Sequence, residues 1–260
     1  MRITNLGEFV DAIRGIVQGW TLPDAGWYPA PWFRGHGDTK WRLEPSQFRV
    51  SRRHGGIGAD WNNESTLLSE FKYRAPFYLH SLLIPRDDWE WLFLMQHYGL
   101  PTRLLDWTES ALIALHFALR DNRGTSDASV WMLDPWWLNK QSLGEYDIPH
   151  AGDRSVSPWA TGTGKQEPEG RLPVAIKPIQ ASPRITAQRG FFTIHGTERL
   201  ALHKVAESAA TKKELHELVI PAESVPALKG DLELAGISET TIFPELEGLC
   251  REMKEWFYGR

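Results

Sequence analysis

Apolar residues recur at helical spacing near both ends of the chain. Residues 4–19 carry one apolar stripe, and its period predicts an amphipathic helix. Two more helices are predicted near residues 224–236 and 244–258, where Pro244 suits the first turn of the second. The stripe of the first helix consists of Leu6, Phe9, Val10, Ile13 and Ile16.

The middle of the chain contains helical patterns whose ends are marked by particular residues. Residues 64–80 have helical periodicity, and Pro76 should kink or shorten that helix. Asp87 and Glu90 form a capping box, and Gly99 is a stop signal, so another helix is predicted between them.

A third internal helix is predicted to be buried. Residues 102–105 read as a short strand, and Asp106 with Glu109 then makes a capping box that opens a helix over residues 107–120. This helix is apolar almost all round, which is typical of a central helix.

Short apolar runs between turn residues predict the strands. No regular alternation of strand and helix joins them, so the pattern favours an α+β fold. Residues 139–172 lose periodicity and are predicted to form a long loop or insertion, and residues 51–62 a mobile loop. The predicted strands are residues 31–34, 41–43, 102–105, 129–133, 174–176, 191–194 and 218–220.

Composition narrows the functional classes. The net charge is −4 and the isoelectric point is near 6.1, which argues against a non-specific duplex-DNA binder but permits a small nucleotide ligand. The 13 tryptophans are many for 260 residues, and some are expected to line a cleft or an interface. The single cysteine, Cys250, excludes an intramolecular disulfide and is predicted to be buried. Without a signal peptide or a long apolar run, we expect a cytoplasmic protein with no membrane partner.

The residues richest in candidate chemistry are residues 32–37 (WFRGHG) and 96–108 (QHYGLPTRLLDWT). Arg34 lies between an aromatic pair and two glycines, one of which is Gly35. A packed core is not expected to need these glycines. An arginine there can bind an oxyanion, and the alternative is a structural salt bridge to Asp106 or Glu44.

Other candidates also have two interpretations. Asp106 and Thr108 would lie at a helix N-terminus, as anion ligands or as plain caps. His97 and Tyr98 would form a cleft wall with a stacking ring, or His97 would only interact with a helix dipole. Gln188 would fix a ligand hydroxyl or amide, or cap the following strand.

A further group of basic residues offers a weaker signal. Arg49, Arg52, Arg53 and His54 form a basic patch, read as a solvated loop or as a contact for phosphates. Phosphate-loop, dinucleotide-loop, nucleophile-elbow and zinc-helix motifs are absent, and the histidines lack metal-ligand spacing, so no metal site is expected.

The tripeptide at 33–35 (FRG) resembles the opening of the FRG domain family. The similarity continues at residues 41–46, 97–108, 187–193 and 243–248, and the long run GLPTRLLDWT makes chance resemblance implausible. The resemblance implies one FRG-type domain over residues 1–260 and suggests a bacterial toxin or phage-defence setting.

The order of the motifs also resembles the arginine-serine-glutamate class of ADP-ribosyltransferases. That resemblance implies short strands split around a buried central helix with flanking helices, and NAD as the substrate. Arg34 and Gly35 would hold its phosphates, and Glu217, before Leu-Val-Ile-Pro, would assist cleavage at the ribose. This chain departs from the class, because it lacks the Ser-Thr-Ser pattern and the second glutamate beside Glu217.

The leading hypothesis is an NAD-dependent ADP-ribosyltransferase or NAD glycohydrolase with a protein or nucleic-acid acceptor and an inhibitory partner. Tyr98 or Trp107 would stack on a ring, Thr108 and Gln188 would position the ribose or nicotinamide, and Gln188 would replace Glu217 if the glutamate is not catalytic. The alternatives are a non-catalytic module that binds a nucleotide or a nucleic-acid end, and a protein-interaction domain with a tryptophan-rich face.

Overall fold

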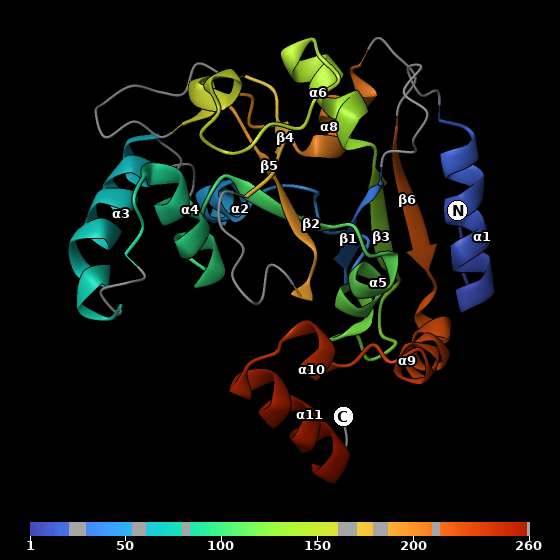
Figure 1. Cartoon of the computed structure of the whole chain (residues 1–260). Coiled ribbons are helices and arrows are strands. Elements are labelled where there is room, and N and C mark those ends of the chain that lie inside the picture. The colour runs from blue at the N-terminus through green and yellow to red at the C-terminus, as the bar shows by residue number, and fades with distance from the viewer. Residues whose placement is uncertain are drawn as a thin grey trace.

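A computed structural model describes residues 1–20, 30–53, 61–79, 84–160, 171–178, 187–209 and 214–258. It contains a six-stranded sheet whose pairs are all antiparallel, in the order β4-β5-β2-β1-β3-β6, with helices packed around it (Figure 1). The α+β class is therefore confirmed. The strands are β1 (Trp32–His36), β2 (Leu104–Thr108), β3 (Ala128–Leu133), β4 (Val174–Ile176), β5 (Gly190–Ile194) and β6 (Leu215–Ile220).

The central strands are buried on both faces. Successive side chains of a strand point to opposite faces, so Phe33, Val130 and Leu218 share one core cluster with α1 (Leu6–Gln18), α5 (Ala111–Leu119) and α9 (Val225–Leu234). The opposite face packs Trp32, Trp107 and Trp131 against α6 (Pro135–Leu143) and α8 (Leu202–Glu207). Burial on both faces explains why β3 reads as continuous apolar sequence.

Helix α5 crosses β1 at Gly35. A Cβ atom at this position would lie 2.1 Å from the Ala114 carbonyl oxygen and 2.4 Å from the Ala118 nitrogen. The prediction that nothing in the core requires this glycine is therefore wrong. Gly35 allows the backbone of the buried helix to contact the strand directly.

A buried ion pair attaches the helices beside β2. Arg103 and Glu64 have fully buried side chains, and Arg103 Nε lies 2.5 Å from the Glu64 carboxylate. The other arginine nitrogens donate to the carbonyls of His195 and Trp159 at 2.7 and 2.8 Å. Arg103 thus joins α3 to the sheet. The helical elements on this side are α2 (Ser46–Arg53), α3 (Trp61–Arg74), η1 (Ala75–Phe77), α4 (Asp88–His97) and η3 (Arg154–Trp159).

The C-terminal elements lie beyond the end of the sheet, in red in Figure 1. After β6 the chain forms η4 (Ala222–Ser224), α9, α10 (Glu239–Ile242) and α11 (Leu246–Tyr258). Cys250 is exposed on α11, so the prediction of a buried thiol is wrong. The apolar stripe of α11, including Leu246 and Trp256, faces solvent in the described part of the chain.

Several element predictions also need correction. The structure has no strand over residues 41–43. The predicted loop over residues 51–62 is also wrong at both ends, because residues 51–53 belong to α2 and residues 61–62 belong to α3. Residues 54–60 lie outside the described part. Residues 139–143 continue α6 and 154–159 form η3, so 139–172 is not one irregular loop; residues 161–170 lie outside the description. The prediction that Pro76 shortens the helix is confirmed, because α3 ends at Arg74 and η1, which contains Pro76, follows directly.

Candidate functional site

A cleft opens where β1 and β2 part. The two strands pair at Phe33 and Thr108, and a cavity of about 270 Å³ lies beside this pair, under α5. A smaller cavity of about 70 Å³ shares Gln96, Asp106, Trp107 and Gln188 with it. We treat both cavities as one cleft. The larger cavity is lined by Phe33, Arg34, Gly35, Gln96, Asp106, Trp107, Thr108, Ala114, Phe117 and Gln188.

Arg34 is the cation of the cleft wall. Its Nη1 donates to the Asp106 backbone carbonyl at 2.8 Å and lies 3.5 Å from the Asp106 carboxylate. Burial lowers the pKa of Arg34 from its ordinary value, and the nearby Asp106 opposes that effect. Of the two interpretations, the salt bridge is observed, with Asp106 as the partner, because Glu44 instead pairs with Arg42 at 3.3 Å. Anion binding by Arg34 stays a prediction.

His36 accepts from Arg34 on the other side of the guanidinium. The distance from Arg34 Nε to His36 Nε2 is 3.4 Å, and the imidazole is buried. Burial, with the charge of Arg34 as a further cause, lowers the pKa of His36 to about 3. A neutral imidazole therefore leaves the charge of Arg34 uncompensated on this side.

Asp106 lies inside β2 and not at the start of a helix, so its predicted role as a helix cap is wrong. The α5 cap is Ser110, whose hydroxyl accepts from Ile113 N at 3.4 Å. The Asp106 carboxylate, 54% exposed, accepts from Gln96 Nε2 at 2.8 Å. The sequence interpretation missed Gln96, although it directly precedes the His-Tyr-Gly motif.

The side chain of Thr108 is hydrogen-bonded to the main chain of Gln188. Thr108 Oγ1 donates to the Gln188 carbonyl at 2.6 Å and accepts from Ser110 N at 3.0 Å. Its hydroxyl thus fixes the loop before β5. The next residue, Arg189, has a φ of 47°, which is rare for a residue with a side chain and marks strain beside the cleft.

The aromatic candidates differ in position. Trp107 is buried, its indole Nε1 donates to Thr193 Oγ1 at 3.1 Å, and the residue lines both cavities. His97 lines the smaller cavity. Tyr98 is 65% exposed and lines neither cavity, so the structure does not bring it into the cleft.

Glu217 is also outside the cleft. It lies on β6 opposite Trp131, which in turn pairs with Arg34 on β1, so two strand spacings separate it from Arg34. It lines neither cavity, whereas Gln188 lines both. The sequence interpretation named Gln188 as the residue that would replace the glutamate, and that role stays a prediction.

The described residues contain no group of three or more side chains arranged to hold a metal ion. Across the same part of the chain, every helix is too short or too polar to span a bilayer. Of the basic patch, Arg49 is exposed on α2, and the side chains of residues 52–54 lie outside the description. Most described tryptophans are buried, with Trp41 and Trp256 as the exposed exceptions, so no tryptophan-rich face is visible there.

Comparison with known proteins gives one match. The family model of the FRG domain matches residues 30–127. This part of the chain is therefore similar to FRG domains. No curated protein and no solved structure matches the chain.

The FRG match covers part of the molecule and part of the cleft. It contains β1, β2 and α5, and therefore Arg34, Gln96, Asp106 and Thr108. It ends at residue 127, directly before β3, so the other four strands lie outside it. Gln188 completes the cleft from beyond the FRG match, and the motifs at 187–193 and 243–248 also lie beyond it.

Proposed function

We propose that the cleft binds NAD and that the protein is an ADP-ribosyltransferase-like enzyme that transfers or hydrolyses the ADP-ribose unit. The observation that carries the proposal is the convergence of Arg34, Asp106 and Gln188 from three segments on one cavity. The motif order agrees with it, because the arginine is on the first strand and Thr108 ends the second strand just before a buried helix.

The proposed roles follow from the chemistry of each group. Arg34 would bind a phosphate, because its fork of donors suits oxyanions. The cavity, at about 270 Å³, is slightly smaller than typical ligand sites, so it would hold one end of the dinucleotide. Gln188 would contact the nicotinamide or its ribose, and Trp107 with Phe117 would provide apolar walls.

The reaction breaks the bond between ribose C1′ and the nicotinamide nitrogen. The bonding electrons leave with nicotinamide, and C1′ gains positive charge in an oxocarbenium-like state. Water or an acceptor then bonds to C1′ and loses a proton. A carboxylate near C1′ would stabilise this charge, and we assign it to Asp106 because Asp106 lines the cleft and Glu217 does not.

Nicotinamide release by the purified protein tests the proposal. We expect Asp106→Asn to lower kcat about 100-fold or more and Arg34→Ala to raise KM for NAD about tenfold or more. Glu217→Gln should retain release, and circular dichroism should show that each variant is folded. Loss of release in Glu217→Gln alone would move the catalytic carboxylate to β6. Absence of both NAD binding and release in the wild type would refute the proposal.

A second candidate is a non-catalytic nucleotide-binding module. It is favoured by the contacts of Asp106, because its carboxylate already meets Arg34 and Gln96. Calorimetric binding of NAD that Arg34→Ala removes, without nicotinamide release, would support this candidate. A toxin or phage-defence role belongs to the first proposal, and it would need an acceptor and an inhibitory partner.

A further inference from the structure

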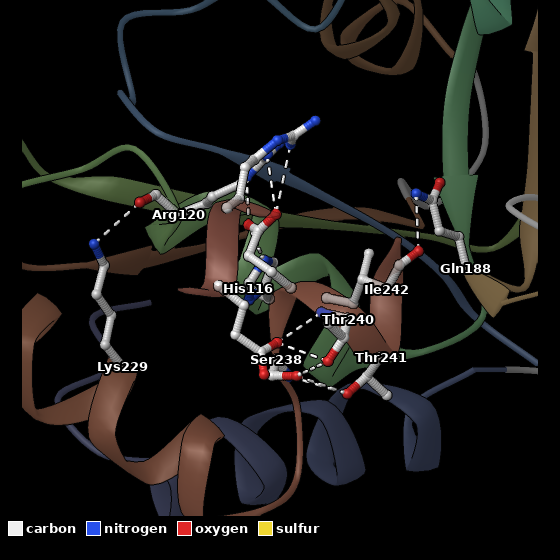
Figure 2. Close-up of polar contacts among 11 residues, drawn as sticks. His116, Arg120, Gln188, Lys229, Ser238, Thr240, Thr241 and Ile242 are labelled. Carbon is white, nitrogen blue, oxygen red and sulfur yellow. Dashed lines mark hydrogen bonds and ion pairs between the residues drawn. The ribbon is translucent and has the colours of Figure 1, made fainter. Parts of the chain in front are cut away.

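A second polar cluster adjoins the cleft behind α5. Glu239, the first residue of α10, is 5% exposed. Its carboxylate pairs with the guanidinium of Arg120, the C-terminal cap of α5, with Nε at 2.6 Å and Nη2 at 3.1 Å. His116 of α5 lies 3.2 Å from the same carboxylate, and Arg251 of α11 lies 3.5 Å away. Figure 2 shows His116 and Arg120 beside the short helix that carries Thr240 and Ile242.

The other end of α10 contacts the cleft. Gln188 Nε2 donates to the carbonyl of Ile242, the last residue of α10, at 3.4 Å (Figure 2). The adjoining Phe243 meets Phe117, a cleft residue, edge to face at 5.9 Å between ring centroids. The guanidinium groups that hold Glu239 also lie over the Phe243 ring, Arg120 at 4.7 Å and Arg251 at 5.0 Å. A four-residue helix thus links a buried ion cluster to two walls of the cleft.

We propose that Glu239 is a positioning residue of the cleft, which fixes α10 so that the Ile242 carbonyl orients the Gln188 carboxamide. This role rests on the proposed function, because it concerns how the same cleft recognises its nucleotide. A helix of four residues has little stability of its own. Its position therefore depends on tertiary contacts, which include those of Glu239 with Arg120 and Arg251, of Thr240 with Glu252 and of Ile242 with Ile113.

The orientation of Gln188 determines what the cleft selects. A carbonyl partner requires the amide nitrogen as donor, so the Gln188 oxygen is left as an acceptor. No described residue donates to that oxygen. Together with the Asp106 carboxylate, it favours a ligand end that carries hydrogen-bond donors and disfavours a carboxylate. The cleft should therefore prefer the amide form of the dinucleotide, NAD, over its nicotinic acid analogue.

Nuclear magnetic resonance of the Gln188 side-chain amide tests the positioning without any ligand. The two proton signals are assigned by their loss in Gln188→Ala. We expect Glu239→Gln to shift or broaden them and Glu207→Gln, which removes an exposed ion pair with Lys204, to leave them unchanged. Arg251→Ala, a milder change at the partly exposed arm of the cluster, should act in the same direction as Glu239→Gln. Unchanged Gln188 signals in a folded Glu239→Gln or Arg251→Ala protein would overturn the proposal.

Kinetics with the two dinucleotides test the specificity. We expect Glu239→Gln to reduce the preference for NAD about fivefold, the change that one hydrogen bond produces, through KM and with kcat largely retained. No preference for NAD in the wild type would overturn the assigned selectivity. If the wild type does not bind NAD while the Gln188 signals still respond to Glu239→Gln, the proposed function fails and the positioning role stands.

Discussion

At the residue scale, Gly35 shows that a residue of a candidate ligand-binding motif can be required for packing, because α5 contacts β1 there. Gly35→Ala should lower the free energy of unfolding by about 3 kcal/mol, because the new Cβ meets α5 backbone that cannot rotate away. Gly37→Ala is the matched control, since its Cβ would approach the Trp41 side chain only to 3.4 Å. We expect it to cost less than about 1 kcal/mol. Urea unfolding followed by tryptophan fluorescence measures both, and equal effects would refute the argument.

The residues of the cleft could be predicted where the residue type and its neighbours in the sequence indicate a binding role. Arg34, Asp106, Trp107 and Gln188 were candidates from their sequence context, and all four line the cleft. Glu217 lies outside the cleft for a geometric reason, because spacing along the chain does not state which strands become neighbours. The neighbours of β1 are β2 and β3, and β6 comes only after β3, which places Glu217 away from the cleft. Gln96 carried no signal of its own, because its role appears only once α4 lies beside β2.

At the element scale, one misplaced cap shifted both β2 and α5. Asp106 with Glu109 fits a capping box, but Ser110 with Ile113 is used, and residues 106–108 pair with β5 instead. Pairing with a neighbouring strand outweighs a local capping preference, since a cap contributes only about 1 kcal/mol. Elements with strong periodicity or long apolar runs, such as α1 and β3, were predicted to within a few residues.

The cap assignment makes a direct prediction. Ser110→Ala should lower the free energy of unfolding by about 1 kcal/mol, because the Ile113 amide loses its side-chain acceptor. Ser157→Ala, which removes a hydroxyl contact within η3, provides a comparison away from α5. Chemical denaturation of both variants measures the difference. If Ser110→Ala has no effect on stability, another residue must cap α5.

At the scale of the whole molecule, two buried histidines make stability depend on pH. Burial lowers the pKa of both His36 and His195 to about 3 from 6.5, so their stabilisation is complete above pH 6.5 and is lost as the pH falls toward 3. Burial raises the pKa of Asp134 to about 6 from 3.8, which acts in the opposite direction within that window. Between pH 6 and about 4, two histidine contributions and one opposing aspartate contribution should therefore give a net loss of about 1.4 kcal/mol per pH unit.

Urea unfolding at pH values above and below 6 tests this balance. His36→Gln should remove one histidine contribution and make stability nearly independent of pH between 6 and 4.5, because the remaining histidine and Asp134 then offset each other. A wild-type free energy of unfolding that rises as the pH falls would contradict neutral histidines in the folded protein.

The end of the FRG match at residue 127 also bears on which part of the chain could fold alone. A segment cut there would keep β1 and β2 but remove β3 from one side and β5 from the other. Two bare strand edges would remain, and such edges promote aggregation between chains. A fragment that ends at residue 127 should therefore aggregate, because four of the six strands of the described sheet lie beyond it. The sheet that pairs both edges of the matched strands is therefore longer than the matched sequence.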